Sequence, residues 1–331
     1  MTYWQNKKVL ITGGAGLIGS ALARDLVNNN SQVTIIDDLS RGNVEFLGDM
    51  AQDIEVKVFD LRNYDRCIEE IKEFDVVIHM ASRVGGIKVY TDKAFSIIND
   101  NLMIDTNVIR ATIKNNIKRF FYASSAHIYP FELQNKKNNT PLIKEKDAYP
   151  ANPLLSYGWA KLIAEKQLEC AVSEIEGFSI AIARYIGIYG PNQDFGLDTG
   201  SVIPVFSHRA IKYPNIDFTV WGNGEETRSY CYIDDAVACT KLMIREMDER
   251  TTVGPYNVGS SEIVKIKDIA QKIIDLSQKD ISLKFATTKK AKILSQWCDC
   301  NHVFEELGWK STTSFEKGLE IVYNDVKGRL E

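Results

Sequence analysis

Short, largely apolar runs alternate with longer amphipathic segments through the first half of the chain. The runs lie at positions 9–12, 32–36, 56–59, 76–80, 120–124 and 180–184. Runs without polar alternation are typical of strands buried on both faces, and the segments between them are long enough for crossover helices. The pattern therefore predicts an α/β fold, a doubly wound parallel (Rossmann) sheet with helices on both sides.

The alternation becomes irregular in the second half of the chain. Apolar residues at helical spacing predict one helix from about residue 266 and another that starts near Ser314. We expect residues 1–190 to form the first domain and residues 191–331 to form a smaller C-terminal lobe. Part of this lobe is expected to return to the first domain.

Local patterns predict one further helix and two surface segments. Asn152-Pro153 predicts a helix start, because asparagine is favoured as an N-cap and proline at the first helical position. The polar stretch 134–140 predicts a surface loop, and the lysine-rich stretch 289–292 predicts a solvated segment.

Composition excludes several classes of protein. The 331 residues are 44% apolar and 25% charged, with a net charge of −4, which excludes a disordered chain and argues against nucleic-acid binding. The one long uncharged stretch, 9–23, is too short and too rich in glycine to cross a membrane. The chain start lacks a secretory pattern and the six cysteines are scattered, so we expect a cytoplasmic protein with no membrane association.

A glycine-rich turn follows the first predicted strand and opens a helix. It contains Gly13, Gly16, Leu17, Ile18 and Gly19. Glycines there let the backbone turn tightly and approach a pyrophosphate, with the amides at the helix N-terminus facing the anion. In this order of strand, glycines and helix, the turn predicts a dinucleotide site.

Acidic residues follow the second and third predicted strands. Asp37-Asp38 comes eighteen residues after Gly19, close to the spacing of the acid that binds the adenosine ribose. A carboxylate there accepts from the ribose 2′-hydroxyl and repels a 2′-phosphate, so the predicted cofactor is NAD rather than NADP. Asp60-Leu61 is a candidate for contact with the adenine, and a structural turn is the competing interpretation.

A tyrosine and a lysine share one face of a predicted helix. Tyr157 and Lys161 are four residues apart, and Ser125 ends the fifth predicted strand, where a doubly wound sheet presents its chemistry. A tyrosine is a weak base at neutral pH unless a cation lies close by, which Lys161 and an oxidised nicotinamide would supply. Tyr157 could then take a hydroxyl proton as hydride leaves carbon.

Together these motifs resemble the extended short-chain dehydrogenases/reductases that act on nucleotide sugars. The resemblance rests on the glycine turn, Ser124-Ser125 and the stretch from Tyr157 to Lys161. The stretches 84–87 and 125–130 are most similar to those of two branches, the GDP-mannose 3,5-epimerases and the GDP-fucose synthases. The resemblance implies an NAD-dependent enzyme whose substrate is a nucleotide sugar, with a GDP-sugar favoured.

The resemblance also implies roles for single residues. Ser125, Tyr157 and Lys161 would form the catalytic triad, with Ser125 also touching the sugar and with Tyr157 and Lys161 also touching NAD. Asn101 would support the substrate site, and Arg228 would contact the substrate diphosphate. No metal is implied. Helices around 101–115 and 153–173 would pair across a twofold axis into a homodimer.

The chain departs from the two branches at their proton shuttle. Where both carry a cysteine, this chain has His127, and an ungapped alignment from Pro191 places Ser201 where the synthases have a histidine. The second acid/base of the epimerases, a lysine, has no clear counterpart here. We expect His127 to have a pKa near neutrality, which suits a base beside C3 and C5. The alternative is that His127 is a hydrogen-bonding wall residue, in which case the site would only oxidise C4, or oxidise and re-reduce it.

Several outcomes remain open at this stage. Oxidation of the sugar at C4 is the favoured step, ending as a 4-ketone or continuing to 4-epimerisation or 3,5-epimerisation. A 4,6-dehydratase is disfavoured, because Ala126-His127 replaces the acidic pair that this reaction uses. An NADPH-dependent 4-keto reductase is disfavoured by Asp37-Asp38, and an NAD-sensing module without turnover is disfavoured by the retained Tyr157 and Lys161.

Overall fold

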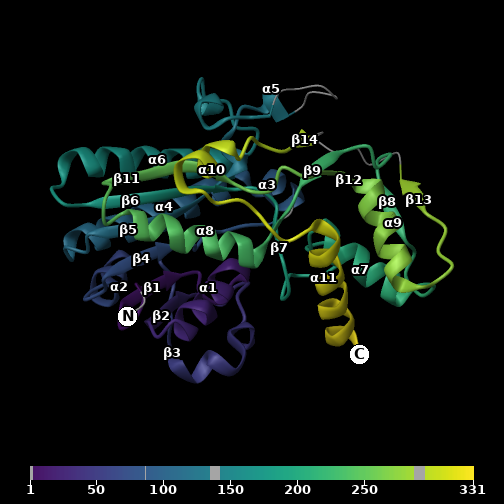
Figure 1. The fold of residues 1–331 in the computed structure, drawn as a ribbon, viewed down its shortest axis with the longest axis horizontal. Coiled ribbons are helices and arrows are strands. Elements are labelled where there is room, and N and C mark those ends of the chain that lie inside the picture. Colours follow the sequence, from purple (N-terminus) through teal and green to yellow (C-terminus); the bar gives the residue numbers. More distant parts are fainter. Residues whose placement is uncertain (1–2, 86, 135–141, 287–294) are drawn as a thin grey trace.

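In the computed structural model, which describes residues 3–85, 87–134, 142–286 and 295–331, seven parallel strands form one twisted sheet. These strands are β1 (Lys8–Thr12), β2 (Gln32–Asp37), β3 (Ile54–Val58), β4 (Val76–His79), β5 (Arg119–Ser125), β6 (Ser179–Tyr185) and β11 (Thr252–Val258). Their order across the sheet is β11-β6-β5-β4-β1-β2-β3, so the chain winds outward in both directions from β1 (Figure 1). The predicted doubly wound parallel sheet is confirmed.

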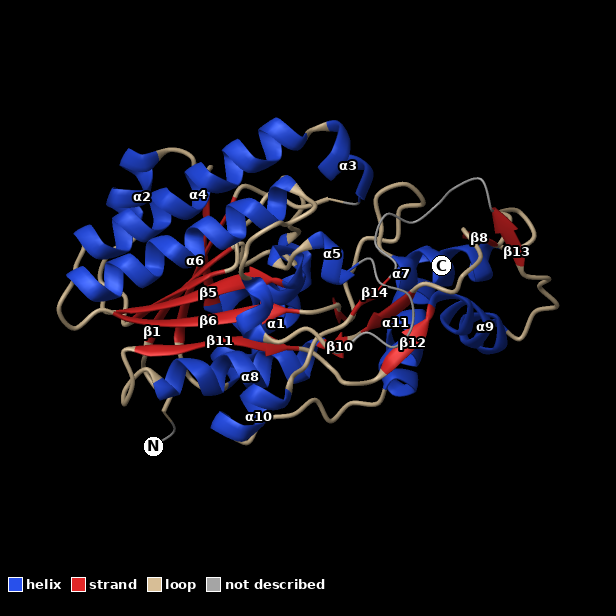
Figure 2. Cartoon of the chain, turned by 90° about the horizontal axis from the view of Figure 1, so that it is seen from above, coloured by secondary structure: helices blue, strands red, loops and turns tan. Residues whose placement is uncertain are grey.

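Helices cover both faces of this sheet. The main ones are α1 (Leu17–Asn28), α2 (Tyr64–Glu70), α4 (Ala94–Lys114), α6 (Ser156–Glu174) and α8 (Ile233–Glu246). Figure 2 shows α2, α4 and α6 on one side and α8 on the other, where α1 packs beside it. The five inner strands send residues to two separate cores: Val9 and Ile11 of β1 pack toward α1, whereas Leu10 packs toward α4.

All six predicted strands are present, within two residues of their expected ends. The seventh strand, β11, was not predicted, because Pro255 interrupts its pattern and its pairing with β6 shifts register between Val253 and Tyr256. The chain beyond residue 190 thus contributes a strand to the first sheet. The division of domains at residue 190 stays a prediction.

The predicted start of α6 at Asn152-Pro153 is wrong. The helix begins at Ser156, because residues 152 and 153 are extended and pair with another segment. The Phe131 amide donates to the Asn152 carbonyl at 2.9 Å, and the Asn152 side chain donates to Glu132 at 2.5 Å. A tertiary partner therefore takes the asparagine away from its expected capping role.

The remaining elements form the smaller lobe and the loops above the sheet. The strands are β7 (Ile188–Tyr189), β8 (Thr219–Trp221), β9 (Thr227–Ser229), β10 (Cys231–Tyr232), β12 (Ile263–Lys265), β13 (Lys284–Ala286) and β14 (Ser295–Gln296). The helices are α3 (Ile87–Asp92), α5 (Phe131–Gln134), α7 (Val202–Lys212), α9 (Ile266–Ser277), α10 (Asn301–Leu307) and α11 (Phe315–Leu330), with short 3-10 segments η1 (Val44–Asp53), η2 (Ala126–Ile128) and η3 (Glu145–Ala148).

The two helices predicted for the second half are confirmed. Ile266, Ile269 and Ile273 of α9 are buried, and the Ser314 hydroxyl accepts from the Lys317 amide at the start of α11. The surface loop expected at 134–140 is wrong at its first residue, because Gln134 ends α5 and is buried. The rest of that stretch and the lysine run at 289–292 lie outside the described residues. No described helix combines the length and apolar character needed to cross a membrane.

Candidate active site

A cavity of about 950 Å³ opens at the carboxyl ends of the central strands. Its walls include Gly13, Gly16, Leu17, Ile18, Gly19, Asp37, Asp60, Leu61, Tyr157 and Lys161, which are all ten residues predicted to bind the cofactor. Ser125 lines it as well. The topology explains this convergence, because parallel strands end at one edge and their loops meet above it.

The glycine turn forms the floor of the cavity. Gly13 has φ +67°, and a Cβ on it would lie 2.7 Å from the backbone of Ala81. Gly16 precedes α1 in an extended conformation, and no side chain caps the helix. The N-terminal amides of α1 therefore remain available to an anion in the cavity, as a pyrophosphate requires.

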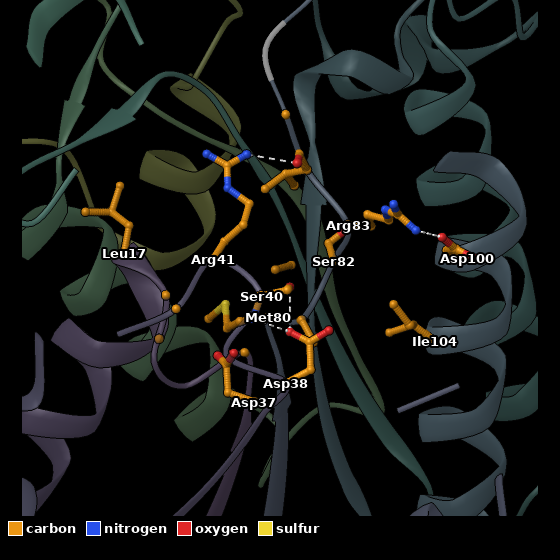
Figure 3. Close-up of a pocket in the computed structure, with 18 of the residues that line it drawn as sticks. Leu17, Asp37, Asp38, Ser40, Arg41, Met80, Ser82, Arg83, Asp100 and Ile104 are labelled. Carbon is orange, nitrogen blue, oxygen red and sulfur yellow. Dashed lines mark hydrogen bonds and ion pairs between the residues drawn. The ribbon is translucent and has the colours of Figure 1, made fainter. Parts of the chain in front are cut away.

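Asp37 is buried beside this turn. Its carboxylate accepts from the Ala15 amide at 3.0 Å and from the Leu39 amide at 2.9 Å, so it also holds the turn in place. Burial raises the pKa of Asp37 above its usual value. Asp38 and Ser40, which bond to each other, line the same wall (Figure 3). The ribose role of Asp37 stays a prediction.

Asp60 is engaged by a neighbouring cation. Arg62 donates to both of its oxygens, and these bonds hold the pKa of Asp60 below its usual value. Arg62 and Arg83 also pair with Asp100, the second contact being visible in Figure 3. A structural role for the Asp60 turn is therefore present, and contact of Asp60-Leu61 with an adenine stays a prediction.

Arg41 reaches across the cavity mouth. It donates to the Val84 carbonyl at 2.9 Å and pairs with Asp194 of the smaller lobe at 3.6 Å. The side chains of this pair are about half exposed, so their contribution to stability is small. Their position nevertheless links the two halves of the chain over the predicted dinucleotide site.

Tyr157 enters the cavity from the first turn of α6. The next residue, Gly158, lies so close to the His127 carbonyl that a Cβ would approach it within 2.1 Å, which fixes the start of α6 against η2. Burial raises the pKa of Tyr157 above its usual range, although hydrogen bonds with Ser82 and Ser125 oppose this effect. A positive charge near the ring is therefore needed for the hydroxyl to act as a base.

Lys161 lies one turn further along α6 and is almost completely buried. Its Nζ lies 4.5 Å from the centre of the Tyr122 ring and 5.9 Å from that of Tyr157. The Nζ has no hydrogen-bond partner and lines the cavity. An ammonium with free donors in this position fits a bound dinucleotide, whose hydroxyls would accept from it.

Asn101 lies behind the cavity wall. Its side-chain oxygen accepts from the Ser82 hydroxyl at 2.6 Å and from the Arg83 amide at 2.8 Å, and its amide nitrogen donates to the Arg83 and Ile97 carbonyls. Asn101 thus positions Ser82, which in turn bonds to Tyr157. Direct contact between Asn101 and a substrate stays a prediction.

His127 lies beside Tyr157, and Arg228, from the other half of the chain, is near enough for its charge to act on the imidazole. The ring centre of His127 lies 5.9 Å from that of Tyr157 and 6.1 Å from that of Tyr90. The predicted pKa near neutrality is wrong, because burial, and then the charge of Arg228, lower the pKa of His127 to about 4. At neutral pH this imidazole is uncharged and weakly basic.

Sequence reasoning missed three residues at this site. Ser82 follows β4 at the carboxyl edge of the sheet, a position that could have revealed it. Tyr90 stacks on Tyr157 with ring centres 5.3 Å apart, and Asp105 of α4 lies 3.8 Å from Lys161 Nζ. No pattern in the sequence indicates either contact. Ser201 lies exposed before α7, where it accepts from the Gln193 side chain.

A model of the NAD dependent epimerase/dehydratase family matches residues 9–259. The chain belongs to this family. The GDP-mannose 3,5-epimerase of Arabidopsis thaliana is 33% identical over 333 residues, covering 99% of this chain and 85% of that protein. The UDP-N-acetyl-alpha-D-glucosaminuronate decarboxylase of Bacillus cytotoxicus is 29% identical, covering 95% and 96%.

Membership of the NAD dependent epimerase/dehydratase family agrees with the solved structures. The crystal structure of UDP-glucose 4-epimerase with UDP-glucose from Thermotoga maritima superimposes with a TM-score of 0.85 and 24% identity, covering 98% of this chain and all of that one. At this identity the likeness supports the fold alone. Membership confirms the predicted family, enzyme class and NAD cofactor.

Proposed function

We propose that this chain oxidises the C4 hydroxyl of a nucleotide sugar. One observation carries the proposal: Tyr157, Lys161 and Ser125 line the same cavity as the glycine turn. This arrangement brings a proton acceptor, a cation and a dinucleotide site together. When bound, NAD supplies the hydride acceptor for this oxidation.

The protein's own groups would handle the proton. Tyr157 takes the proton from the C4 hydroxyl, and the charge of Lys161 favours the phenolate that this step needs. Ser125, which shares a hydrogen bond with Tyr157, orients the same hydroxyl. Asn101 holds Ser82 in place by accepting from its hydroxyl.

The substrate would extend from the cavity toward the smaller lobe. Arg228 of β9 is near enough to His127 for its charge to act there, and its guanidinium can bind diphosphate oxygens through two parallel hydrogen bonds. The similarity of nearly the whole chain to a GDP-mannose 3,5-epimerase favours a GDP-sugar over other nucleotide sugars. The stretch 289–292 lies outside the described residues and adds nothing to this argument.

The fate of the 4-ketone depends on a base beside C3 and C5. His127 stands near Tyr157, but a pKa of about 4 makes it a weak base at neutral pH. A second acid/base is not evident among the described residues around it. We therefore favour oxidation at C4, with or without return of the hydride, over inversion at both C3 and C5.

The function is tested by incubating the purified protein with a panel of nucleotide sugars, GDP-mannose among them. Absorbance of reduced nicotinamide reports oxidation, and deuterium uptake from heavy water reports exchange at C3 or C5. We expect reduction of bound NAD with a GDP-sugar. The proposal would be refuted if no nucleotide sugar reduced bound NAD, even transiently, and none was converted to a 4-ketone or a C4 epimer.

The role of His127 is tested in the same assay. If it is the base, His127→Ala should abolish deuterium incorporation at C3 and C5 while NAD reduction persists, because C4 oxidation does not use it. If it is a wall residue, as its lowered pKa favours, the wild type should incorporate no deuterium. Uptake that persists in the variant would point to a different base.

We infer that the protein is a homodimer through α4 and α6. These helices flank a groove of about 520 Å³ lined by Ile109, Ile113 and Ile163, and Ile163 and Met103 are each about 40% exposed. Apolar side chains left open on two adjacent helices are typical of an interface.

Placing a charge in this interface should separate the subunits. We expect Ile163→Glu to sediment as a monomer at micromolar concentration, because an isolated carboxylate would be buried on association. Ile263→Glu is the matched control, since Ile263 is similarly exposed but lies on β12 of the smaller lobe. A dimer that resists Ile163→Glu, or a wild type that is monomeric, would refute the inference.

We also propose that the protein works in the cytoplasm. All six cysteines are free thiols, and four of them are buried, which suits a reducing compartment. Fractionation of cells that express the tagged chain would test this location, and recovery from an oxidising compartment would contradict it.

A further inference from the structure

A buried cluster of polar side chains lies next to Lys161. Its centre is Asp105 of α4, a fully buried carboxylate. His79 of β4, Tyr122 of β5 and Thr12 of β1 complete the cluster, and all three are also fully buried. The proposed function assigns no role to Asp105.

The hydrogen bonds of the cluster all lead, from donor to acceptor, to the carboxylate of Asp105. The Ala81 amide donates to the Thr12 hydroxyl, which donates to Nδ1 of His79 at 2.6 Å. His79 then donates from Nε2 to Asp105 Oδ1 at 2.9 Å, and burial lowers the pKa of His79, so the ring is neutral. The Tyr122 hydroxyl donates to Asp105 Oδ2 at 2.8 Å.

These contacts leave Asp105 as the charged member of the cluster. Burial by itself raises the pKa of Asp105, but the charge of Lys161 and the bonds from His79 and Tyr122 outweigh it and hold the pKa below its usual value. Both carboxylate oxygens are held by neutral donors. The carboxylate is therefore ionised and cannot rotate freely.

The other groups around Lys161 do not replace this charge. The rings of Tyr122 and Tyr157 lie near it, and burial raises the pKa values of both, which favours their uncharged forms. Glu165 is one turn along α6, but its oxygens accept from Arg184 and Ser124. The negative charge of Glu165 is thus already paired with Arg184.

We propose that Asp105 is a positioning residue that keeps Lys161 charged and leaves its ammonium donors directed at the cavity. Lys161 Nζ lies 3.8 Å from Asp105 Oδ1, within the range of an ion pair but beyond a hydrogen bond. The carboxylate therefore supplies charge without occupying a donor. The consequence for catalysis, support of a Tyr157 phenolate through Lys161, rests on the proposed function.

The opposing forces explain why a counter-ion is needed. Burial lowers the pKa of Lys161, whereas the charges of Asp105 and Glu165 oppose this effect. The other acidic neighbour of this buried ammonium is already paired, so without Asp105 the pKa of Lys161 would fall further and the charged form would be less stable. A neutral Lys161 would no longer stabilise a phenolate.

The first test is a titration of Lys161 by NMR in protein with isotope-labelled lysine and bound NAD. The Lys161 signal is assigned by its loss in Lys161→Met. We expect Asp105→Asn to move the midpoint to lower pH by about 1 to 3 units, the usual effect of removing an opposite charge at this distance. Tyr122→Phe is the matched control, because it removes a donor to Asp105 and keeps the carboxylate, so the midpoint should stay within half a unit or so of the wild type.

The second test is a double-mutant cycle that follows thermal unfolding. It remains informative if Asp105→Asn is less stable, because the loss of stability is itself the quantity compared. If Asp105 is the counter-ion, this change should lower the melting temperature by at least about 5 °C more in the Lys161 background than in Lys161→Met. Equal losses of melting temperature in the two backgrounds would mean that Asp105 stabilises the protein only through its hydrogen bonds with His79 and Tyr122. That result, or an unmoved Lys161 midpoint, would overturn the inference.

Catalysis provides a separate readout. In Asp105→Asn, the acid limb of the plot of NAD reduction rate against pH should move to higher pH. At neutral pH, kcat should fall and KM should change little. Neither the titration nor the unfolding cycle uses a sugar. Absence of turnover with every nucleotide sugar would therefore refute the proposed function alone, whereas an unmoved Lys161 midpoint would refute the role of Asp105 alone.

Discussion

Replacing Tyr157 by phenylalanine should lower turnover by about 10² to 10⁴-fold, the usual contribution of a general base. The variant keeps the ring that stacks on Tyr90 and loses only the hydroxyl that bonds to Ser82 and Ser125. Binding of the nucleotide sugar should survive, because Arg228 and the cavity walls are unchanged. The measurement is the rate of NAD reduction at saturating substrate, with affinity followed by calorimetry.

Tyr149→Phe is the matched control for this variant. Tyr149 is largely exposed and does not line the cavity, so loss of its hydroxyl should leave turnover unchanged. Full activity in Tyr157→Phe would show that the triad assignment is wrong. A loss of substrate affinity without a loss of turnover would make Tyr157 a binding group instead of a base.

The largest expected change in stability comes from the ion pair between Arg184 of β6 and Glu165 of α6. Arg184 donates to Glu165 from Nε at 3.0 Å and from Nη2 at 2.6 Å, and both side chains are no more than 3% exposed. Arg184→Met would leave Glu165 buried without its cation. We expect the free energy of unfolding to fall by about 3 to 5 kcal/mol, the usual cost of an unpaired buried charge.

Arg250→Met provides the comparison for this prediction. Arg250 pairs with Glu306 at 2.9 Å, but about 40% of each side chain is exposed, so water solvates the carboxylate that remains. Its loss should change the free energy of unfolding by less than about 1 kcal/mol. Denaturant unfolding of both variants checks the difference, and similar losses in the two would contradict the argument from burial.

Local sequence patterns were sufficient for most of the sheet and for the dinucleotide turn. Each of the six predicted strands is an apolar run without polar alternation. Such runs are typical of strands buried on both faces, so the parallel sheet could be predicted from them. Gly13 and Asp37 were recognisable because backbone geometry and chemistry at that turn restrict the residue types. Tyr157 and Lys161 share a helix face wherever α6 begins, so the error at Asn152 did not affect them.

Features that depend on distant partners were not predictable in this way. The seventh strand, β11, has no clean pattern, and it is completed by pairing with β6. The start of α6 is decided by the pairing of residues 130 and 153. In both cases a long-range backbone contact outweighs a local preference.

The sequence by itself determined the family and the cofactor and indicated the side chains that we propose to react, because these depend on residue types at short, fixed spacings. Only the tertiary structure decided the pKa values and the charged neighbours of these side chains. The pKa of His127 is low because the fold buries it and brings Arg228 near it, and Asp105 reaches Lys161 because α4 packs against α6. A charge acts through space at the dielectric of its surroundings, and neither the distance nor the burial is encoded by neighbours along the chain.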